Sequence, residues 1–135
     1  MNKKIVLLAG PTASGKTKIA IKLAQRINGE IINTDSMQVF KDFQILSSRP
    51  NKYELKLAKH HLYGFQSSGA LFSTGIWLKL AEKKIRQIIK KGKVPILVGG
   101  TGLYFKAITD GISKIPSIKS TDRKKIRNLH QILGQ

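Results

Sequence analysis

The sequence is organised around Gly10-Pro11-Thr12-Ala13-Ser14-Gly15-Lys16-Thr17, which fits the phosphate-loop pattern G-x-x-x-x-G-K-[ST]. An apolar run at residues 5–9 leads into this stretch, and a helical pattern at 16–28 leads out of it. Strand, loop and helix in this order turn backbone N–H groups and a helix N-terminus toward one anion. The stretch therefore predicts a di- or triphosphate site, in preference to a Gly/Ser turn that merely precedes a helix.

Each residue type in this phosphate loop (residues 10–17) has a role in the prediction. Gly10 and Gly15 allow a tight turn and a close approach of the backbone to a ligand. Lys16 can reach the terminal phosphates, and the hydroxyl of Thr17 can bind Mg²⁺. The predicted phosphate-binding residues are Gly10, Pro11, Thr12, Ala13, Ser14, Gly15, Lys16 and Thr17.

Strands alternate with helices along the chain, and this alternation indicates a parallel sheet. We expect three strands, at 4–9, 30–34 and 94–98. The expected helices cover 16–28, 53–59, 75–91 and 103–110, and a last basic helix is capped by Ser120 or Thr121. The sequence therefore predicts an α/β fold.

Asp35 follows the second predicted strand directly. Ligands of parallel sheets bind beyond the carboxyl ends of the strands, and this rule places Asp35 beside the phosphate loop. The chain has seven carboxylates, and Asp35 is the best candidate among them for a general base or for orienting a nucleophile. The alternative is an Asx turn or a helix cap just after a strand.

The third strand ends without an acid. Many phosphate-loop enzymes that hydrolyse nucleotides hold Mg²⁺ with an Asp at such a strand end. Here Val98 is followed by Gly99, Gly100 and Thr101. This pattern argues against a motor or a switch and favours an enzyme that binds a diphosphate and brings a nucleophile to it. The two glycines leave room for a ligand, and Thr101 offers a hydroxyl.

Composition sets the remaining limits. The 135 residues correspond to one domain, and 25 Lys+Arg against 7 Asp+Glu give a net charge of +18. This surplus favours a nucleic-acid partner, although an AT-rich genome would also raise Lys, Ile and Asn. There is no cysteine and no apolar run of 18 residues, so we expect no disulfide, no membrane span and a cytoplasmic protein.

Several other features have simple structural interpretations. Adjacent His60 and His61 point apart and lack a third ligand at a fitting spacing, so we expect a hydrogen-bonded structural histidine and no zinc site. Trp77 lies on the apolar stripe of its helix and is expected in the core. The basic faces of helix 75–91 and of residues 119–127 either contact phosphates or are simply solvated.

Taken together, these residues resemble the N-terminal part of the tRNA dimethylallyltransferase (isopentenyl-diphosphate:tRNA transferase) family. The match is in the family's order over nearly all of the 135 residues. Its pieces are the phosphate loop, Asp35-Ser36-Met37-Gln38-Val39-Phe40, Ser48-Arg49-Pro50, His60-His61-Leu62, Phe72-Ser73 and Pro95-Ile96-Leu97-Val98-Gly99-Gly100-Thr101-Gly102-Leu103-Tyr104-Phe105.

The resemblance implies a reaction and roles for residues. The family transfers a dimethylallyl group from its diphosphate to N6 of adenosine 37 in the anticodon loop of tRNA. Lys16 and a Mg²⁺ bound by Thr17 would stabilise the leaving diphosphate, and Asp35 would accept the N6 proton of a flipped adenine. The catalytic residues carried over are Asp35, Lys16 and Thr101, and the tRNA-binding residues are Asp35, Ser36, Met37, Gln38, Thr101 and Arg123.

The resemblance also implies an incomplete fold. It predicts a P-loop NTPase-like three-layer parallel sheet over residues 1–112 and the start of a helical tRNA-binding insertion domain over 113–135. The match covers less than half of the family's usual span, so we expect the later core strands and the C-terminal half to be missing. We expect a monomer that folds poorly or has little activity alone, unless another chain supplies that half. An unpaired edge of the three-stranded sheet would contribute to this.

Two other functions stay open on the sequence. A phosphate-loop small-molecule kinase or a nucleotide-prenylating enzyme would share the loop and the sheet but would not need the net charge of +18. A basic RNA-binding remnant without catalysis would need the charge but not Asp35.

Overall fold

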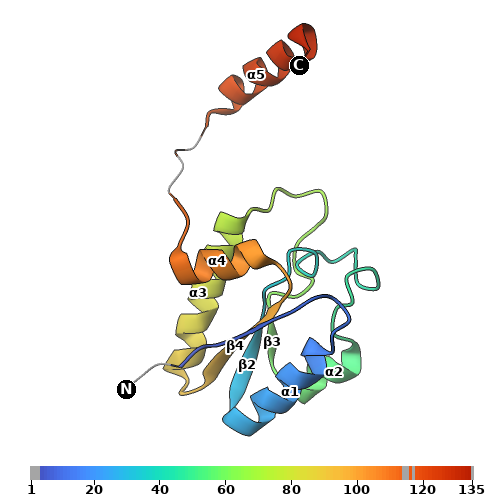
Figure 1. Cartoon of the computed structure of the whole chain (residues 1–135), viewed down its shortest axis with the longest axis vertical. Coiled ribbons are helices and arrows are strands. Elements are labelled where there is room, and N and C mark those ends of the chain that lie inside the picture. Colours follow the sequence, from blue (N-terminus) through green and yellow to red (C-terminus); the bar gives the residue numbers. More distant parts are fainter. Residues whose placement is uncertain (1–3, 114–115, 117, 135) are drawn as a thin grey trace.

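A parallel sheet forms the centre of the molecule (Figure 1). The structure, a computed structural model, describes residues 4–113, 116 and 118–134. Four strands lie in the order β1 (Val6–Ala9), β4 (Val94–Gly99), β2 (Gly29–Asn33) and β3 (His60–His61). All pairs are parallel, and Val98 is opposite both Leu8 of β1 and Asn33 of β2. The carboxyl ends of the strands therefore meet at one edge.

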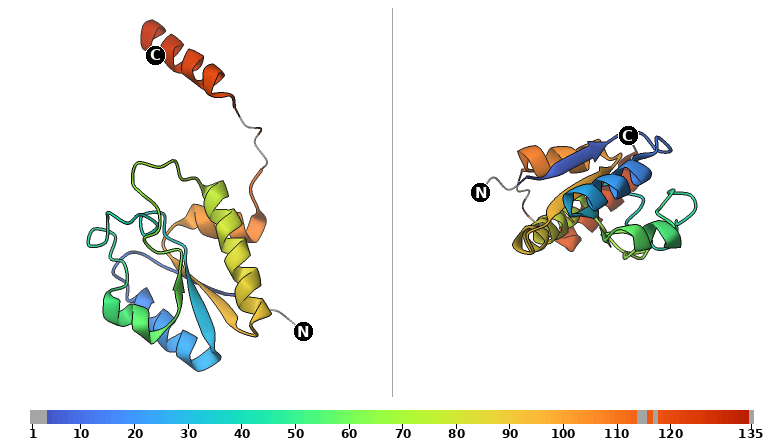
Figure 2. Two further views of the ribbon diagram at one scale, coloured as in Figure 1. Left: turned by 180° about the vertical axis from the view of Figure 1, so that it is seen from behind. Right: turned by 90° about the horizontal axis from the view of Figure 1, so that it is seen from below.

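Helices cover both faces of the sheet, which makes three layers (Figure 2). Helix α1 (Lys16–Ile27) packs its buried Ala20, Ile21 and Ala24 against one face, and α2 (Lys52–Leu57) lies beside it. Helices α3 (Thr74–Lys90) and α4 (Gly102–Asp110) cover the other face. The predicted α/β class and its three-layer, phosphate-loop type of sheet are confirmed.

The prediction of only three strands was wrong. The short strand β3 adds to β2, where Ile32 lies opposite His61, and β4 is paired on both sides. In the described part of the sheet, β1 and the two-residue strand β3 form the two edges, so an unpaired edge remains beside β1. Two residues are too few to produce the alternation that marks a strand, and a helix of only six residues precedes them.

Most helix ends follow the sequence signals. Asn28 ends α1 with a positive φ of 53°, and Ser73 caps α3 by accepting a hydrogen bond from the Ile76 N–H at 3.2 Å. Trp77 is fully buried, as predicted. The predicted cap of the last helix was wrong, because Lys119 occupies the cap position and Ser120 is the first residue of α5 (Ser120–Leu133).

Helix α5 differs from the other long helices because none of its described residues is buried. In Figure 1 it lies apart from the sheet and its covering helices. Its apolar Ile126, Leu129 and Ile132 are 68%, 60% and 79% exposed. The division of the chain into 1–112 and 113–135 stays a prediction, and residues 1–3, 114, 115, 117 and 135 lie outside the described residues.

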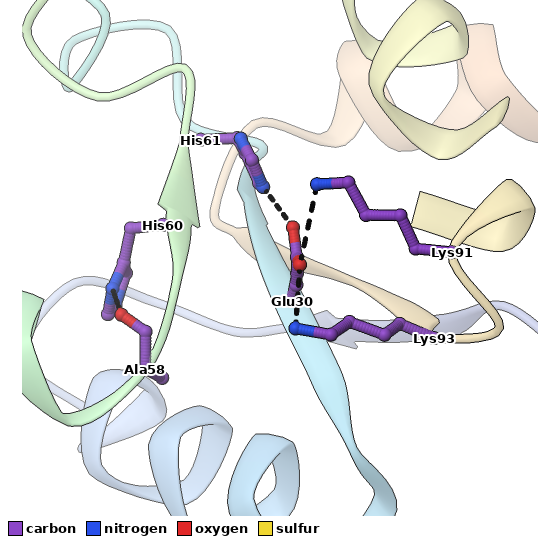
Figure 3. Close-up of polar contacts among 6 residues, drawn as sticks. All are labelled: Glu30, Ala58, His60, His61, Lys91 and Lys93. Carbon is purple, nitrogen blue, oxygen red and sulfur yellow. Dashed lines mark hydrogen bonds and ion pairs between the residues drawn. The ribbon is translucent and has the colours of Figure 1, made fainter. Parts of the chain in front are cut away.

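A buried carboxylate joins three elements at the amino end of β2 (Figure 3). The side chain of Glu30 is 3% exposed and accepts from His61 Nε2 at 2.7 Å and Lys93 Nζ at 2.9 Å, with Lys91 Nζ at 3.8 Å. Burial alone would raise the pKa of Glu30, but the bonds from Lys93 and His61 and the charge of Lys91 lower that pKa to about 2. His61 is thus a structural histidine, as predicted, and it fastens β3 to β2.

Candidate active site

The phosphate loop connects β1 to α1 and turns through two left-handed residues. Gly15 has a φ of 82° and Ala13 a φ of 62°, so the chain reverses sharply before the helix begins at Lys16. The Lys16 side chain lies back across the loop, where Nζ donates to the Pro11 carbonyl and, at 3.3 Å, to Ser14 Oγ. The N-terminus of α1 and this ammonium group both favour an anion at the loop.

Asp35 stands just beyond the carboxyl end of β2. Its Oδ1 accepts a hydrogen bond from the Met37 N–H at 2.9 Å, which is the Asx turn named as the alternative role. The turn uses one oxygen only. The other oxygen, Oδ2, lies on the side of Gly100, since a Cβ added at Gly100 would be 3.8 Å from it. An Asx turn and a chemical role are therefore compatible in this residue.

Gly99, the last residue of β4, and Gly100, which follows it, allow the strand ends to approach closely. A Cβ added at Gly99 would lie 2.1 Å from the carbonyl oxygen of Thr34, and one at Gly100 would lie 3.1 Å from that of Gly10. The Gly10 N–H also donates to the Gly99 carbonyl at 3.2 Å. The Gly-Gly pair thus brings the segment before Asp35 close to the start of the phosphate loop, and at Gly99 the approach leaves no room for a Cβ.

Thr101, the residue before helix α4, connects that helix to the segment that follows β2. Its Oγ1 accepts from the Ser36 N–H at 2.9 Å and donates to Ser36 Oγ at 3.3 Å. The Thr101 hydroxyl is therefore engaged with the predicted tRNA-contacting segment, next to Asp35.

One cavity of about 270 Å³ contains both predicted chemical groups. The phosphate-loop residues 12–17 form one wall of it, and Asp35 reaches it from the end of β2. Its remaining lining residues are Lys18, Gln38, Ser48, Glu54, Tyr63, Val98 and Gly99. The strand-end rule placed Asp35 beside the loop, and the structure brings the two together.

Other predicted residues lie outside this lining. Ser36, Met37 and Thr101 stand beside Asp35, and the Met37 side chain is 51% exposed. Gly10 and Pro11 belong to the loop but do not line the cavity, and Arg123 is an exposed residue of α5. In the part of the chain that the structure describes, the cavity therefore joins the phosphate loop to Asp35 and Gln38, and leaves out the other predicted tRNA-binding residues.

Four polar residues of the cavity were not among the predicted site residues: Lys18, Ser48, Glu54 and Tyr63. Glu54 belongs to a capping box, in which the Asn51 side chain accepts from the Glu54 N–H at 2.9 Å and Glu54 Oε2 accepts from the Asn51 N–H at 2.9 Å. The N-x-x-E spacing of 51–54 is a readable signal for a helix start, although not for a site. Tyr63 follows the two-residue strand β3 and carries no sequence signal.

The tyrosine hydroxyls near Asp35 stay protonated. Burial, followed by the charge of Asp35, raises the pKa of Tyr63 well above its usual range and the pKa of Tyr104 to about 12. Tyr63, which also lines the cavity, is thus neutral at pH 7. The cavity combines an anion-binding wall formed by the loop, Lys16 and Lys18 with an acceptor at Asp35.

Metal-binding side chains are sparse. Among the residues the structure describes, no group of three or more His, Cys, Asp or Glu could hold a metal ion, and His60 and His61 have separate structural partners. A closed zinc-type centre therefore does not fit these residues. Within the same described ranges, no helix is long and apolar enough to cross a membrane.

Comparisons with known proteins agree on one family. The model of the IPP transferase family matches residues 38–135. The tRNA dimethylallyltransferase of Pelagibacter ubique (strain HTCC1062) is 57% identical over 132 residues, which cover 98% of this chain and 42% of that protein. The enzyme of the same name from Rhizobium meliloti (strain 1021) is 48% identical over 122 residues, covering 90% of this chain and 40% of that protein.

Solved structures have the same fold. The tRNA isopentenylpyrophosphate transferase of Bacillus halodurans superposes with a TM-score of 0.80 at 34% identity, over 98% of this chain and 44% of that one. A eukaryotic dimethylallyltransferase, solved acting on tRNA, gives a TM-score of 0.81 at 30% identity, over 91% of this chain and 32% of that one. This chain thus spans about two fifths of the length of the curated relatives it matches. With its phosphate loop, its strand-end aspartate and these matches, the chain belongs to the IPP transferase family.

Proposed function

We propose that this chain carries the diphosphate-binding and base-facing part of a tRNA dimethylallyltransferase. The single observation that carries the proposal is the shared cavity, which Lys16 and Thr17 line from the loop and Asp35 lines from the end of β2. A donor diphosphate at the loop and an amine at Asp35 would then meet within one space. The names of the relatives support this choice of substrates over a small-molecule kinase.

In the proposed reaction the lone pair of the adenosine-37 N6 attacks C1 of the dimethylallyl group. The bond between C1 and the diphosphate oxygen breaks, and the diphosphate leaves with the electron pair. Lys16 and the loop N–H groups stabilise the charge that develops on it. Asp35 accepts the proton released from N6, so that its carboxylate acts as the general base.

Mg²⁺ fits the oxygen donors at the loop. This ion prefers hard oxygen ligands and usually keeps several waters, and it binds through few protein groups together with substrate phosphates. Thr17 lines the cavity and offers such an oxygen, so we infer that Thr17 and the donor diphosphate hold the ion. When bound, Mg²⁺ would neutralise charge on the leaving diphosphate.

Basic residues supply the attraction for tRNA. The net charge of +18 favours a polyanion, and the eukaryotic relative was solved acting on tRNA. We propose that the anticodon loop contacts Ser36, Met37, Gln38 and Thr101 around Asp35, and that Arg123 contacts the stem. Because the proposed substrate is tRNA, we also propose that the protein is cytoplasmic. We further propose that it acts as a monomer once the remaining part of the family's fold is supplied.

The test is a product assay with the 135-residue chain. The chain is incubated with Mg²⁺, dimethylallyl diphosphate and unmodified tRNA, alone and with the remainder of the Pelagibacter ubique relative added as a second chain. The added chain matters because residues 1–135 span only 42% of that relative. We expect prenylated adenosine with the second chain present, little without it, and none with Asp35→Ala.

Other outcomes would replace the proposal. Product that persists undiminished in Asp35→Ala would remove Asp35 from the chemistry. Consumption of ATP with a small acceptor would indicate a kinase. Salt-sensitive tRNA binding without product, even with the second chain, would indicate an RNA-binding remnant.

A further inference from the structure

We propose that Asn33 is the positioning residue of Asp35: its buried amide fixes the backbone of Asp35 so that the carboxylate faces the cavity. This inference rests on the function proposed above, since Asp35 is taken as the base of the prenyl transfer.

The amide of Asn33 holds both backbone groups of Asp35. The side chain of Asn33, the last residue of β2, is fully buried. Its Oδ1 accepts from the Asp35 N–H at 2.9 Å, and its Nδ2 donates to the Asp35 carbonyl at 3.0 Å. The two bonds hold the peptide groups on either side of the Asp35 Cα, and together they restrict the φ and ψ of Asp35 more than either bond alone. Because the Asp35 backbone is held in this way, its side chain keeps one direction even though Asp35 lies outside the strand.

Asn33 is itself held from two sides. Its Nδ2 also donates to the carbonyl of Leu62 at 3.0 Å, and its own carbonyl accepts from Nε1 of Trp77 at 2.9 Å. Trp77 is fully buried and stacks on Tyr104 at 4.2 Å with an interplanar angle of 14°. A buried amide with these partners is rigid, as a residue that positions a catalytic group must be.

The bond to Leu62 joins Asp35 to a second wall of the cavity. Leu62 has a φ of 62° and is followed by Tyr63, whose phenol lines the cavity with Asp35. The Asn33 side chain therefore bonds both to the backbone of the proposed base and to the residue that precedes Tyr63. The end of β2 and the end of β3 meet at Asn33.

The carboxylate of Asp35 is left with one oxygen for a substrate. Oδ1 accepts from the Met37 N–H, and in the described part of the chain no hydrogen bond involves Oδ2, which lies on the side of Gly100. Rotation of the Asp35 peptide would change which oxygen is available. Loss of the Asn33 amide should therefore slow the chemical step and leave donor binding at the phosphate loop intact.

A purely structural role for Asn33 predicts a different result. In that case Asn33→Ala would lower stability but would not separate kcat from KM. The neighbouring Thr34→Val is the matched control, because Thr34 is equally buried and, among the described residues, its hydroxyl forms a single hydrogen bond, to the Ile32 carbonyl at 3.4 Å.

The experiment uses the 135-residue chain with the second chain of the product assay. We expect Asn33→Ala to lower kcat by roughly 10- to 100-fold, the cost of misplacing a catalytic group, with KM for dimethylallyl diphosphate unchanged. Thr34→Val should leave both constants unchanged. In an Asp35→Asn background Asn33→Ala should have no further effect. Should the alanine variant fail to fold, Asn33→Ser keeps a hydroxyl at this position and should show a smaller loss of kcat.

A second measurement needs no activity. Hydrogen exchange of the Asp35 amide, followed in the 135-residue chain, should become faster in Asn33→Ala and stay unchanged in Thr34→Val. If the chain shows no turnover but does show this exchange pattern, the proposed function is contradicted, whereas the contact between Asn33 and Asp35 is supported. Unchanged exchange at Asp35, or a change in KM as large as the change in kcat, would overturn the inference.

Discussion

Glu30 lies within β2 and Asp35 lies just beyond the end of that strand, and their surroundings are opposite. Glu30, near the amino end, is buried among His61, Lys91 and Lys93. Asp35, beyond the carboxyl end, borders a cavity and shares it with the phosphate loop. Parallel sheets bind ligands at the carboxyl ends of their strands, so the first carboxylate stabilises the sheet and the second is free to act.

The difference lies in how each carboxylate is satisfied. Both oxygens of Glu30 have partners, Oε2 the imidazole of His61 and Oε1 the ammonium group of Lys93. Asp35 uses Oδ1 on the Met37 N–H, and its backbone is held by Asn33. A burial criterion alone would therefore select the wrong carboxylate of this strand as functional.

The largest expected effect is on the rate of prenyl transfer, which should depend on Asp35 and not on Glu30. Asp35→Asn should lower the rate of prenyl transfer by roughly 10²- to 10⁴-fold, the usual contribution of a general base, and leave the free energy of unfolding nearly unchanged. Glu30→Gln should keep the rate within about twofold in the same assay, because Glu30 does not line the cavity. A large loss of rate in Glu30→Gln with a small one in Asp35→Asn would reverse the comparison.

The next effect concerns the glycine contact that brings Asp35 to the loop. Gly99→Ala should lower the free energy of unfolding by about 1–3 kcal/mol, because the added Cβ would lie 2.1 Å from the Thr34 carbonyl oxygen. Gly102→Ala is the matched control, since a Cβ there meets nothing within 4 Å. Urea unfolding of both variants measures the difference, and equal stabilities would mean that this close approach is not required.

A similar loss of stability should follow from removing the Glu30 carboxylate. Glu30→Gln should lower the free energy of unfolding by about 2 kcal/mol, because charge-assisted hydrogen bonds from His61 and Lys93 are lost. Affinity for dimethylallyl diphosphate should not change, because the phosphate loop is untouched. Stability equal to the wild type in urea would show that the cluster is not stabilising.

The smallest effect is a dependence of stability on pH. The pKa of Glu30 falls from 4.5 to about 2 on folding, so the unfolded state binds more protons and stability decreases as the pH falls from about 5 toward 2. Burial lowers the pKa of His60 and of His61 below 6.5, so these side chains also reduce stability as the pH falls through 6.5. Urea unfolding at pH 7, 5 and 3 checks the sign. Glu30→Gln should show a smaller loss between pH 5 and 3, and an equal loss would assign it to other groups.

Much of the fold was readable from the sequence because its signals are local. The helices α1, α3 and α4 follow their apolar spacing, and the apolar residues of β1, β2 and β4 mark three of the strands. Strand β3 was missed because its pairing with β2 comes from contacts across the sheet, among them the bond between His61 and Glu30. Glu54 and Tyr63 line the cavity with residues that are far away in the sequence, so no local sequence pattern predicts their place there.

The sequence predicted those parts of the candidate site whose position depends on the sheet topology alone. A residue directly after a parallel strand must lie at the ligand-binding edge, and that rule found Asp35. The rule does not say how Asp35 is held, because the role of Asn33 depends on Leu62 and Trp77, which are 29 and 44 residues away in the sequence. The contacts of Arg123 with tRNA stay a prediction for the same reason, since α5 has no buried residue to fix its place.

Binding of dimethylallyl diphosphate to the 135-residue chain is the sharpest test of the phosphate loop as the donor site, because it needs no second chain. Titration calorimetry with Mg²⁺ present should show binding to the wild type and to Asp35→Asn. Lys16→Ala should weaken it by roughly 10- to 100-fold, the value of a charge-assisted hydrogen bond. No binding to the wild type, or equal binding to Lys16→Ala, would contradict a phosphate loop that holds the donor opposite Asp35.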